Sequence, residues 1–142
     1  MPVADLDRWT SPSLEKAPRL SPADAEQLAS DLFGLRARAT PLASERDQNF
    51  CLESADGGRF VLKVANRGEE RRMLEAENAA MRHLAATGLV PSPIATREGD
   101  YIAQCDGHFV RLITWLDGRP LAEAPRQTAA LLENVGRSVG TL

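Results

Sequence analysis

The sequence predicts an α+β fold: a five-stranded, mostly antiparallel sheet of two hairpins plus an edge strand, with one long covering helix and flanking helices. Two Asp-Gly dipeptides, Asp56-Gly57 and Asp106-Gly107, each separate two short apolar segments. This dipeptide favours the tight turn of a β-hairpin. A long helical pattern, residues 69–86, lies between the two hairpins. Consecutive hairpins with a helix laid across them pack as a sheet covered on one face.

The N-terminal segment predicts an arm followed by a helix. Residues 1–20 contain three prolines among serines and charges, so we expect a flexible arm. Ser21 is a helix N-cap residue, Pro22 suits the first helical position, and Asp24 stands where the acid of a capping box belongs. An apolar stripe follows and Gly34 ends it.

The remaining elements are predicted from the hydrophobic periodicity and from the Gly, Pro and Asp residues that mark turns. Residues 35–42 predict a weak first strand, 50–54 a second and 59–65 a third. The helix of residues 69–86 is closed by Gly88. The second hairpin joins 101–105 to 108–116, and 125–142 form a last helix. The expected order is therefore α–β–β–β–α–β–β–α.

Composition excludes several classes of protein. The 142 residues fit one domain, and 43% hydrophobic with 26% charged residues is typical of a globular chain. A net charge of −3 gives no electrostatic footprint for nucleic acid or an anionic membrane. No signal peptide pattern and no membrane-spanning run is present, so we expect a cytoplasmic protein.

The cysteines and histidines carry no metal-site pattern. Cys51 and Cys105 are too few for a disulfide framework, and we expect buried free thiols. His83 and His108 stand far apart without companion ligands. No P-loop or dinucleotide fingerprint occurs.

Lys63 is the first residue that indicates chemistry. Strand alternation places it with Val61 and Ala65, while Phe60, Leu62 and Val64 face the other way. Both faces are apolar, so the strand should be central, and a lysine there needs a negative partner or a route to solvent. The alternative is a lysine whose stem lies along the sheet with its ammonium in water.

Glu77 is the second. On the long helix it lines up with Met73, Ala80, Met81 and Leu84, so it lies on the apolar stripe or borders it. An inward acid after an inward lysine predicts a Lys63–Glu77 ion pair, since each group offsets the other's burial. Arg111, inside an apolar strand, also requires an acidic or carbonyl partner that the sequence does not identify.

These residues, with the Val90-Pro91-Ser92-Pro93 segment, resemble the N-lobe of the aminoglycoside phosphotransferase family. Protein kinases share this plan, in which a strand lysine contacts ATP phosphates and pairs with a helix glutamate. The Ser44–Phe50 run resembles the hydroxylysine-kinase-like branch, which includes kinase domains fused to class III aminotransferases. The resemblance implies a kinase N-lobe at residues 21–118, and a hinge exit and helix at 119–142 leading to a missing C-lobe.

The resemblance also implies the nucleotide contacts. Ser44–Asn49 would fold over the ATP phosphates, with Ser44, Arg46 and Asn49 as contacts and Glu45 and Asp47 pointing away. The loop lacks glycine, so an ordinary polar turn is the alternative. Thr114, Trp115 and Leu116 would form the adenine-binding hinge. The expected purine wall is Phe50, Val61 and Ile113, each of which would otherwise be plain core.

The catalytic motif of such kinases, H-x-D-x-x-x-x-N, does not occur, and no aspartate follows Asp117. We therefore expect no catalytic residue in this fragment, ATP with Mg²⁺ as cofactors of the complete protein only, and an excised or incomplete chain. Expected partners are a nucleotide, the C-lobe and a homodimer formed through the exposed cleft face. The alternative function is a non-catalytic docking or dimerisation module of a larger enzyme such as an aminotransferase fusion.

Overall fold

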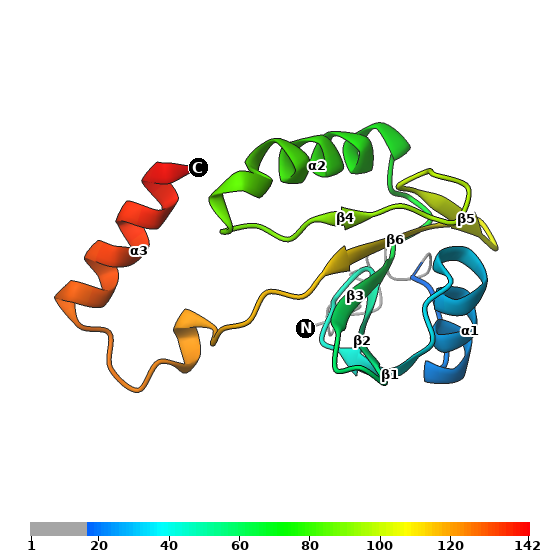
Figure 1. The fold of residues 1–142 in the computed structure, drawn as a ribbon, viewed down its shortest axis with the longest axis horizontal. Coiled ribbons are helices and arrows are strands. Elements are labelled where there is room, and N and C mark those ends of the chain that lie inside the picture. The colour runs from blue at the N-terminus through cyan, green and yellow to red at the C-terminus, as the bar shows by residue number, and fades with distance from the viewer. Residues whose placement is uncertain (1–16) are drawn as a thin grey trace, which may run out of the picture.

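The computed structural model describes residues 17–142 and has the expected α+β architecture (Figure 1). The helices are α1 (Pro22–Phe33), α2 (Arg71–Leu84) and α3 (Ala129–Thr141), with short 3-10 turns at Ala85–Thr87 and Leu121–Glu123. The strands are β1 (Ala37–Leu42), β2 (Gln48–Ser54), β3 (Arg59–Val64), β4 (Pro93–Ile94), β5 (Ala103–Cys105) and β6 (His108–Thr114).

The sheet runs in the order β1-β2-β3-β6-β4, with β5 paired to β6, and every pairing is antiparallel. β3 is therefore central, as the apolar residues on both of its faces predict. β4 is a strand that the sequence did not predict, because its two residues are too few to show a period and one of them is proline.

The local signals at turns and caps are confirmed. Asp106 and Gly107 both have positive φ, 48° and 79°, as a tight hairpin turn between β5 and β6 requires. The capping box at α1 is complete, because the Ser21 hydroxyl accepts from the Asp24 N–H and the Asp24 carboxylate accepts from the Ser21 N–H. Gly34 ends α1 with φ 69°.

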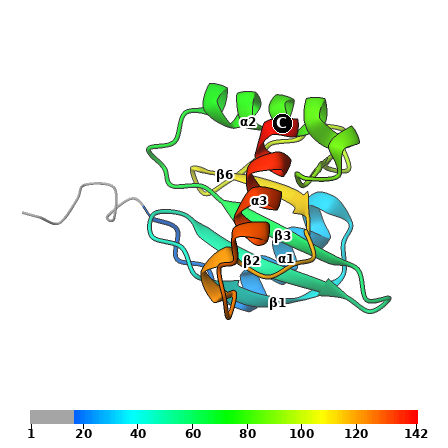
Figure 2. The same ribbon diagram turned by 90° about the vertical axis from the view of Figure 1, so that its left-hand side faces the viewer.

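The main core lies between α1 and one face of the sheet (Figures 1 and 2). Phe50, Leu62 and Leu112 form a row across β2, β3 and β6, and all three are almost fully buried. The small residues Ala25 and Ala29 of α1 let the helix approach this row closely. The first helix, rather than the longer α2, is thus the one that covers the core.

α2 lies on the opposite side of the sheet from α1, above β4 and β6 (Figure 1). Its buried Leu74 packs against a small second core with Ile102 and Phe109. The helix is shorter than the predicted 69–86, because Asn66–Glu69 forms a turn before it and a 3-10 turn follows it.

α3 stands apart from the sheet at the end of a long connection after β6 (Figures 1 and 2). It begins at Ala129 rather than at 125, because the Thr128 hydroxyl caps it by accepting from the Leu131 N–H. Its apolar side chains, including Leu132, Val135 and Val139, are largely exposed. No helix among residues 17–142 is long and apolar enough to cross a membrane.

Residues 1–16 of the expected arm lie outside the described residues. The part that follows contacts the sheet, because Leu20 exchanges two hydrogen bonds of 2.7 Å with the Gln48 side chain of β2.

Candidate functional site

The face of the sheet opposite α1 carries two parallel rows of side chains from β2, β3 and β6. Strand register places Cys51, Val61 and Ile113 in an apolar row. The same register places Asn49, Lys63 and Arg111 in the next row, two residues along each strand. We call these the apolar row and the polar row. Successive residues of a strand point to opposite faces of the sheet. Each residue of these two rows is therefore followed or preceded in the sequence by a residue of the core face.

Lys63 and Asn49 lie side by side in the polar row. Within residues 17–142, Lys63 makes no hydrogen bond or ion pair, and it is half-buried. The Asn49 Oδ1 atom is buried and also lacks a hydrogen-bond partner among the residues that the structure describes. Directly opposed side chains of an antiparallel pair have Cβ atoms about 4.5–5.5 Å apart. A buried acceptor without a partner beside an unpaired cation fits a site that a polar ligand completes.

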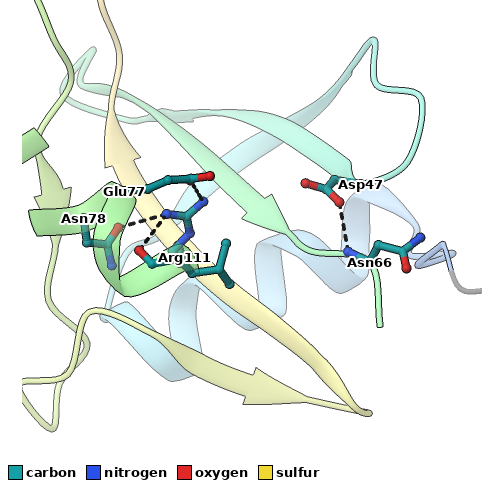
Figure 3. A network of polar contacts seen from close by, with 6 residues as sticks. Asp47, Asn66, Glu77, Asn78 and Arg111 are labelled. Carbon is teal, nitrogen blue, oxygen red and sulfur yellow. Dashed lines mark hydrogen bonds and ion pairs between the residues drawn. The ribbon is translucent and has the colours of Figure 1, made fainter. Parts of the chain in front are cut away.

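The predicted Lys63–Glu77 ion pair is wrong, because Glu77 pairs with Arg111 instead. The Arg111 guanidinium donates to the Glu77 carboxylate at 2.6 Å and to Asn78 Oδ1 at 3.0 Å (Figure 3). It also donates to the Leu74 carbonyl at 3.4 Å. α2 lies above β6, one strand away from Lys63 on β3, so Arg111 reaches the helix first.

This arrangement also answers which partner Arg111 requires. Its side chain is 3% exposed, whereas the Glu77 side chain is 56% exposed. Glu77 therefore borders the buried stripe of α2, while Asn78 occupies the stripe itself. Asn78 could not be identified from the sequence, because the helical pattern alone does not show which edge of the stripe meets the sheet.

The loop between β1 and β2 lies at the polar-row end of the site. Ser44, Glu45 and Arg46 are exposed, and none of their side chains has a partner in the part of the chain that the structure describes. The Asp47 carboxylate accepts from the Asn66 N–H at 2.9 Å, so it turns toward the end of β3 (Figure 3). The side chains of Ser44 and Arg46 remain free to reach a ligand.

The three predicted hinge residues at the end of β6 and after it differ in the hydrogen bonds of their backbone N–H groups. The Thr114 N–H donates to the Ser92 carbonyl at 2.9 Å, and the Trp115 N–H donates to the Arg59 carbonyl at 3.2 Å. The Arg59 guanidinium also stacks on the Trp115 ring and pairs with Asp117. The Leu116 N–H has no acceptor among the described residues. Of the three, Leu116 thus retains a donor for a ligand.

One predicted wall residue is wrong. Phe50 is fully buried in the core under α1, on the opposite face from Lys63. Val61 and Ile113 do lie in the apolar row, and Cys51 completes it in place of Phe50. Strand alternation alone places Cys51 on the same face as Asn49 and Phe50 on the other face. The sequence does not show that this face of β2 is also the face of β3 that carries Lys63, because that depends on the register of the two strands.

A family model for the phosphotransferase enzyme family matches residues 38–142, nearly the whole described chain. The chain belongs to the phosphotransferase enzyme family. Curated relatives of this family member include the hydroxylysine kinases of Xenopus laevis and Bos taurus. The first is 32% identical, over 88% of this chain and 38% of the relative. The second is 30% identical, over 96% of this chain and 41% of the relative. The chain therefore spans about two fifths of the length of these relatives.

Two solved structures share the fold of this phosphotransferase-family chain. Amicoumacin kinase, solved with AMP-PNP and Ca²⁺, aligns with a TM-score of 0.62 at 18% identity, over 74% of this chain and 34% of that structure. Spectinomycin phosphotransferase, solved with ADP and spectinomycin, aligns with a TM-score of 0.65 at 15% identity, over 86% and 37%. At this identity the likeness concerns the fold.

The phosphotransferase-family chain offers no metal centre in its described part. No three His, Cys, Asp or Glu side chains gather among residues 17–142 as metal ligands would. His108 has a structural role, since its Nε2 accepts from Arg67 and its Nδ1–H donates to the Ala65 carbonyl at 2.8 Å.

The two cysteines of the phosphotransferase-family chain are free but only partly buried. Burial and the neighbouring Asp106 carboxylate raise the pKa of the Cys105 thiol. Cys105 packs against the main core, whereas Cys51 belongs to the apolar row. Cys51 is therefore the cysteine that faces the candidate site.

Proposed function

We propose that the chain is the nucleotide-binding lobe of an ATP-dependent phosphotransferase that acts on a hydroxyl group of a small molecule. Residues 21–118 form the lobe, and residues 119–142 form the hinge exit and a helix that leads to a C-lobe. The observation that carries the proposal is the pair of rows on the open face of the sheet. An unpaired lysine stands in the polar row, directly beside an apolar row that ends at the hinge segment.

In this proposal the apolar row receives the purine. Val61 and Ile113 supply flat apolar contact, Cys51 extends it, and the Leu116 N–H donates to a ring nitrogen of adenine. The polar row starts two residues further along the strands, a distance of about 6.6 Å. The phosphates extend in that direction, away from the hinge.

The phosphates meet Lys63 at the polar row. Its ammonium is a compact charge suited to phosphate oxygens. Ser44 and Arg46 of the loop lie at the same end, where a guanidinium and backbone N–H groups bind phosphate oxygens. Asn49 uses its buried amide to bind the ligand or a water held by it. The cluster of Glu77, Asn78 and Arg111 fixes α2 beside this site.

The reaction joins the acceptor oxygen to the γ-phosphorus, and the bond from that phosphorus to the bridging oxygen of ADP breaks. The hydroxyl proton passes to a base. The H-x-D-x-x-x-x-N pattern that supplies the base is absent from these 142 residues. Mg²⁺ would neutralise phosphate charge in this chemistry, and no three His, Cys, Asp or Glu side chains gather among residues 17–142 to hold it. This lobe therefore binds and orients the donor, and the C-lobe carries out proton transfer.

The similarity to hydroxylysine kinases supports a proposal for the acceptor class. Hydroxylysine kinases are similar to this chain over most of its length, so we propose an amino acid or amino alcohol with a free hydroxyl. From the Ser44–Phe50 run we also propose that the protein belongs to the branch that includes fusions to class III aminotransferases.

A second candidate function is a non-catalytic docking module with this fold. The observation that favours it is the Glu77–Arg111 pair, because a lobe without a Lys63–Glu77 pair departs from the kinase pattern. In that case Lys63 would bind no phosphate.

Isothermal titration of the full-length protein with Mg-ATP tests the proposal. We expect Lys63→Ala to weaken ATP binding by at least about tenfold, equivalent to ~1.4 kcal/mol. The matched control is Arg72→Ala, which removes one positive charge from the exposed surface of α2. Unchanged ATP affinity in Lys63→Ala would exclude the role of Lys63. A wild-type protein that binds no ATP would support the docking module.

A further inference from the structure

A single buried asparagine joins three parts of the lobe behind the polar row. Asn66 follows β3, is 1% exposed, and lies three residues after Lys63. Its N–H donates to Asp47 Oδ1 at 2.9 Å, and its Nδ2 donates to the Arg46 carbonyl at 3.2 Å. Its Oδ1 accepts from the Gly68 N–H at 2.9 Å. Figure 3 shows the first of these contacts.

The bonds to Arg46 and Asp47 fix the end of the loop that lies beside the polar row. The next residue, Gln48, is fixed as well by its two bonds to Leu20. The last two residues of the loop and the first residue of β2 are thus held by hydrogen bonds, whereas Ser44 and Glu45 have exposed side chains without partners in the described chain.

A loop without glycine needs such an anchor for a physical reason. Glycine lets a backbone adopt the left-handed conformations that turn N–H groups toward a phosphate. The residues from Ala43 to Asp47 contain none. Their backbone direction must therefore be set by bonds from outside the loop, and Asn66 makes two of those bonds from a rigid position at the end of a central strand.

The same side chain also holds the segment that leads into α2. Gly68 donates to Asn66 Oδ1, and the Glu69 N–H donates to the Asn66 carbonyl at 2.9 Å. Asn66 therefore connects the loop, the end of the strand that carries Lys63, and the segment before α2 through hydrogen bonds.

We propose that Asn66 is a positioning residue that sets the β1–β2 loop over the phosphates of the nucleotide. This inference rests on the proposed nucleotide-binding function. It assigns Asn66 and Asp47 to recognition of the phosphate chain and not to recognition of the nucleoside, because both act through the loop and neither lies near the apolar row.

The test compares ATP with adenosine by isothermal titration of the full-length protein. We expect Asn66→Ala and Asp47→Ala each to lower ATP affinity roughly tenfold, the loss expected for bonds to a charged or buried group. Adenosine affinity should change by less than about twofold. Asp47→Asn keeps an acceptor oxygen for the Asn66 N–H and should retain most of the ATP affinity. The control is Asp56→Ala, which removes the same kind of turn bond, to the Gly58 N–H, at the other end of β2 and β3.

The outcomes separate the inference from the proposed function. Loss of ATP affinity with adenosine binding kept supports it, and retained adenosine binding also shows that the variant is folded. An unchanged ratio of ATP to adenosine affinity in both alanine variants overturns it, whether the two affinities persist or fall together. If the wild-type protein binds neither ligand, the proposed function itself has failed, and the inference fails with it.

Discussion

The two faces of the central strand β3 differ in whether their side chains are fully packed and paired within the folded chain. Under α1, Leu62 lies between Phe50 and Leu112 in a row that is almost fully buried and wholly apolar. On the other face its chain neighbour Lys63 has no partner within residues 17–142, and in the same range Asn49 keeps a buried oxygen without a hydrogen bond. A face that is complete without a ligand stabilises the fold, and a face left incomplete is the one available for function.

Arg111 is the exception on the open face. It is buried like a core residue, the Glu77 carboxylate balances its charge, and Asn78 Oδ1 accepts one of its hydrogen bonds. The contrast therefore predicts three levels of effect on stability: large for the α1 face, intermediate for Arg111, and small for polar groups at the surface.

The largest effect should come from Leu62→Ala. Removing a fully buried leucine leaves a cavity, so we expect the free energy of unfolding to fall by about 2–5 kcal/mol. Urea unfolding of the full-length protein measures it. The control is Met73→Ala on α2, where the side chain is 52% exposed and the change should stay within about 0.5 kcal/mol. Equal losses for the two variants would contradict the division into two faces.

Arg111→Met should cost about 1–3 kcal/mol, because Asn78 Oδ1 and the Leu74 carbonyl lose their donor while buried. Glu77 is half-exposed and regains water, which limits the loss. The matched variant is Arg137→Met, whose pair with Glu133 is exposed and worth about 0.3–0.5 kcal/mol. The same urea titrations compare them. If Arg111→Met cost no more than Arg137→Met, the contacts to α2 would not anchor the helix.

The smallest effect concerns the cap of α1, which covers the complete face. Hydrogen bonds from Ser21 lower the pKa of Asp24 below its ordinary 3.8. The ionised form is favoured in the folded state, so its contribution is present above pH 3.8 and is lost as the pH falls through the lower folded-state pKa. Wild type should therefore lose slightly more stability on acidification than Asp24→Asn, measured by thermal unfolding at each pH. Parallel curves would show that the capping carboxylate contributes nothing.

Much of the fold could be predicted because its signals are local. The capping box, the glycine that ends α1, and the Asp106-Gly107 turn each lie within a few residues and need no tertiary information. The predictions differ from the structure at the ends of helices and strands and at β4. The pairing of β4 with β6 depends on contacts between residues distant in the sequence.

The candidate site was predictable only in part, for the same reason. Lys63 on a central strand and Val61 beside it follow from strand period alone. The partner of Glu77 and the replacement of Phe50 by Cys51 depend on which strand lies under α2 and on the register of β2. Asn66 gave no signal, because a single asparagine after a strand is indistinguishable from a turn residue until its neighbours in space are known.

The strand order has a consequence for the sequence of events in folding. β1, β2 and β3 are consecutive hairpins, whereas β6 joins β3 only after the chain has passed through α2, β4 and β5. Strand pairings that close long loops tend to form late, because the chain loses conformational entropy on closing the loop before the new contacts stabilise it. Lys63 and Arg111 face each other across this late seam. We therefore expect a nascent lobe with three strands to form a sheet before Arg111 and Ile113 of β6 complete the proposed nucleotide site.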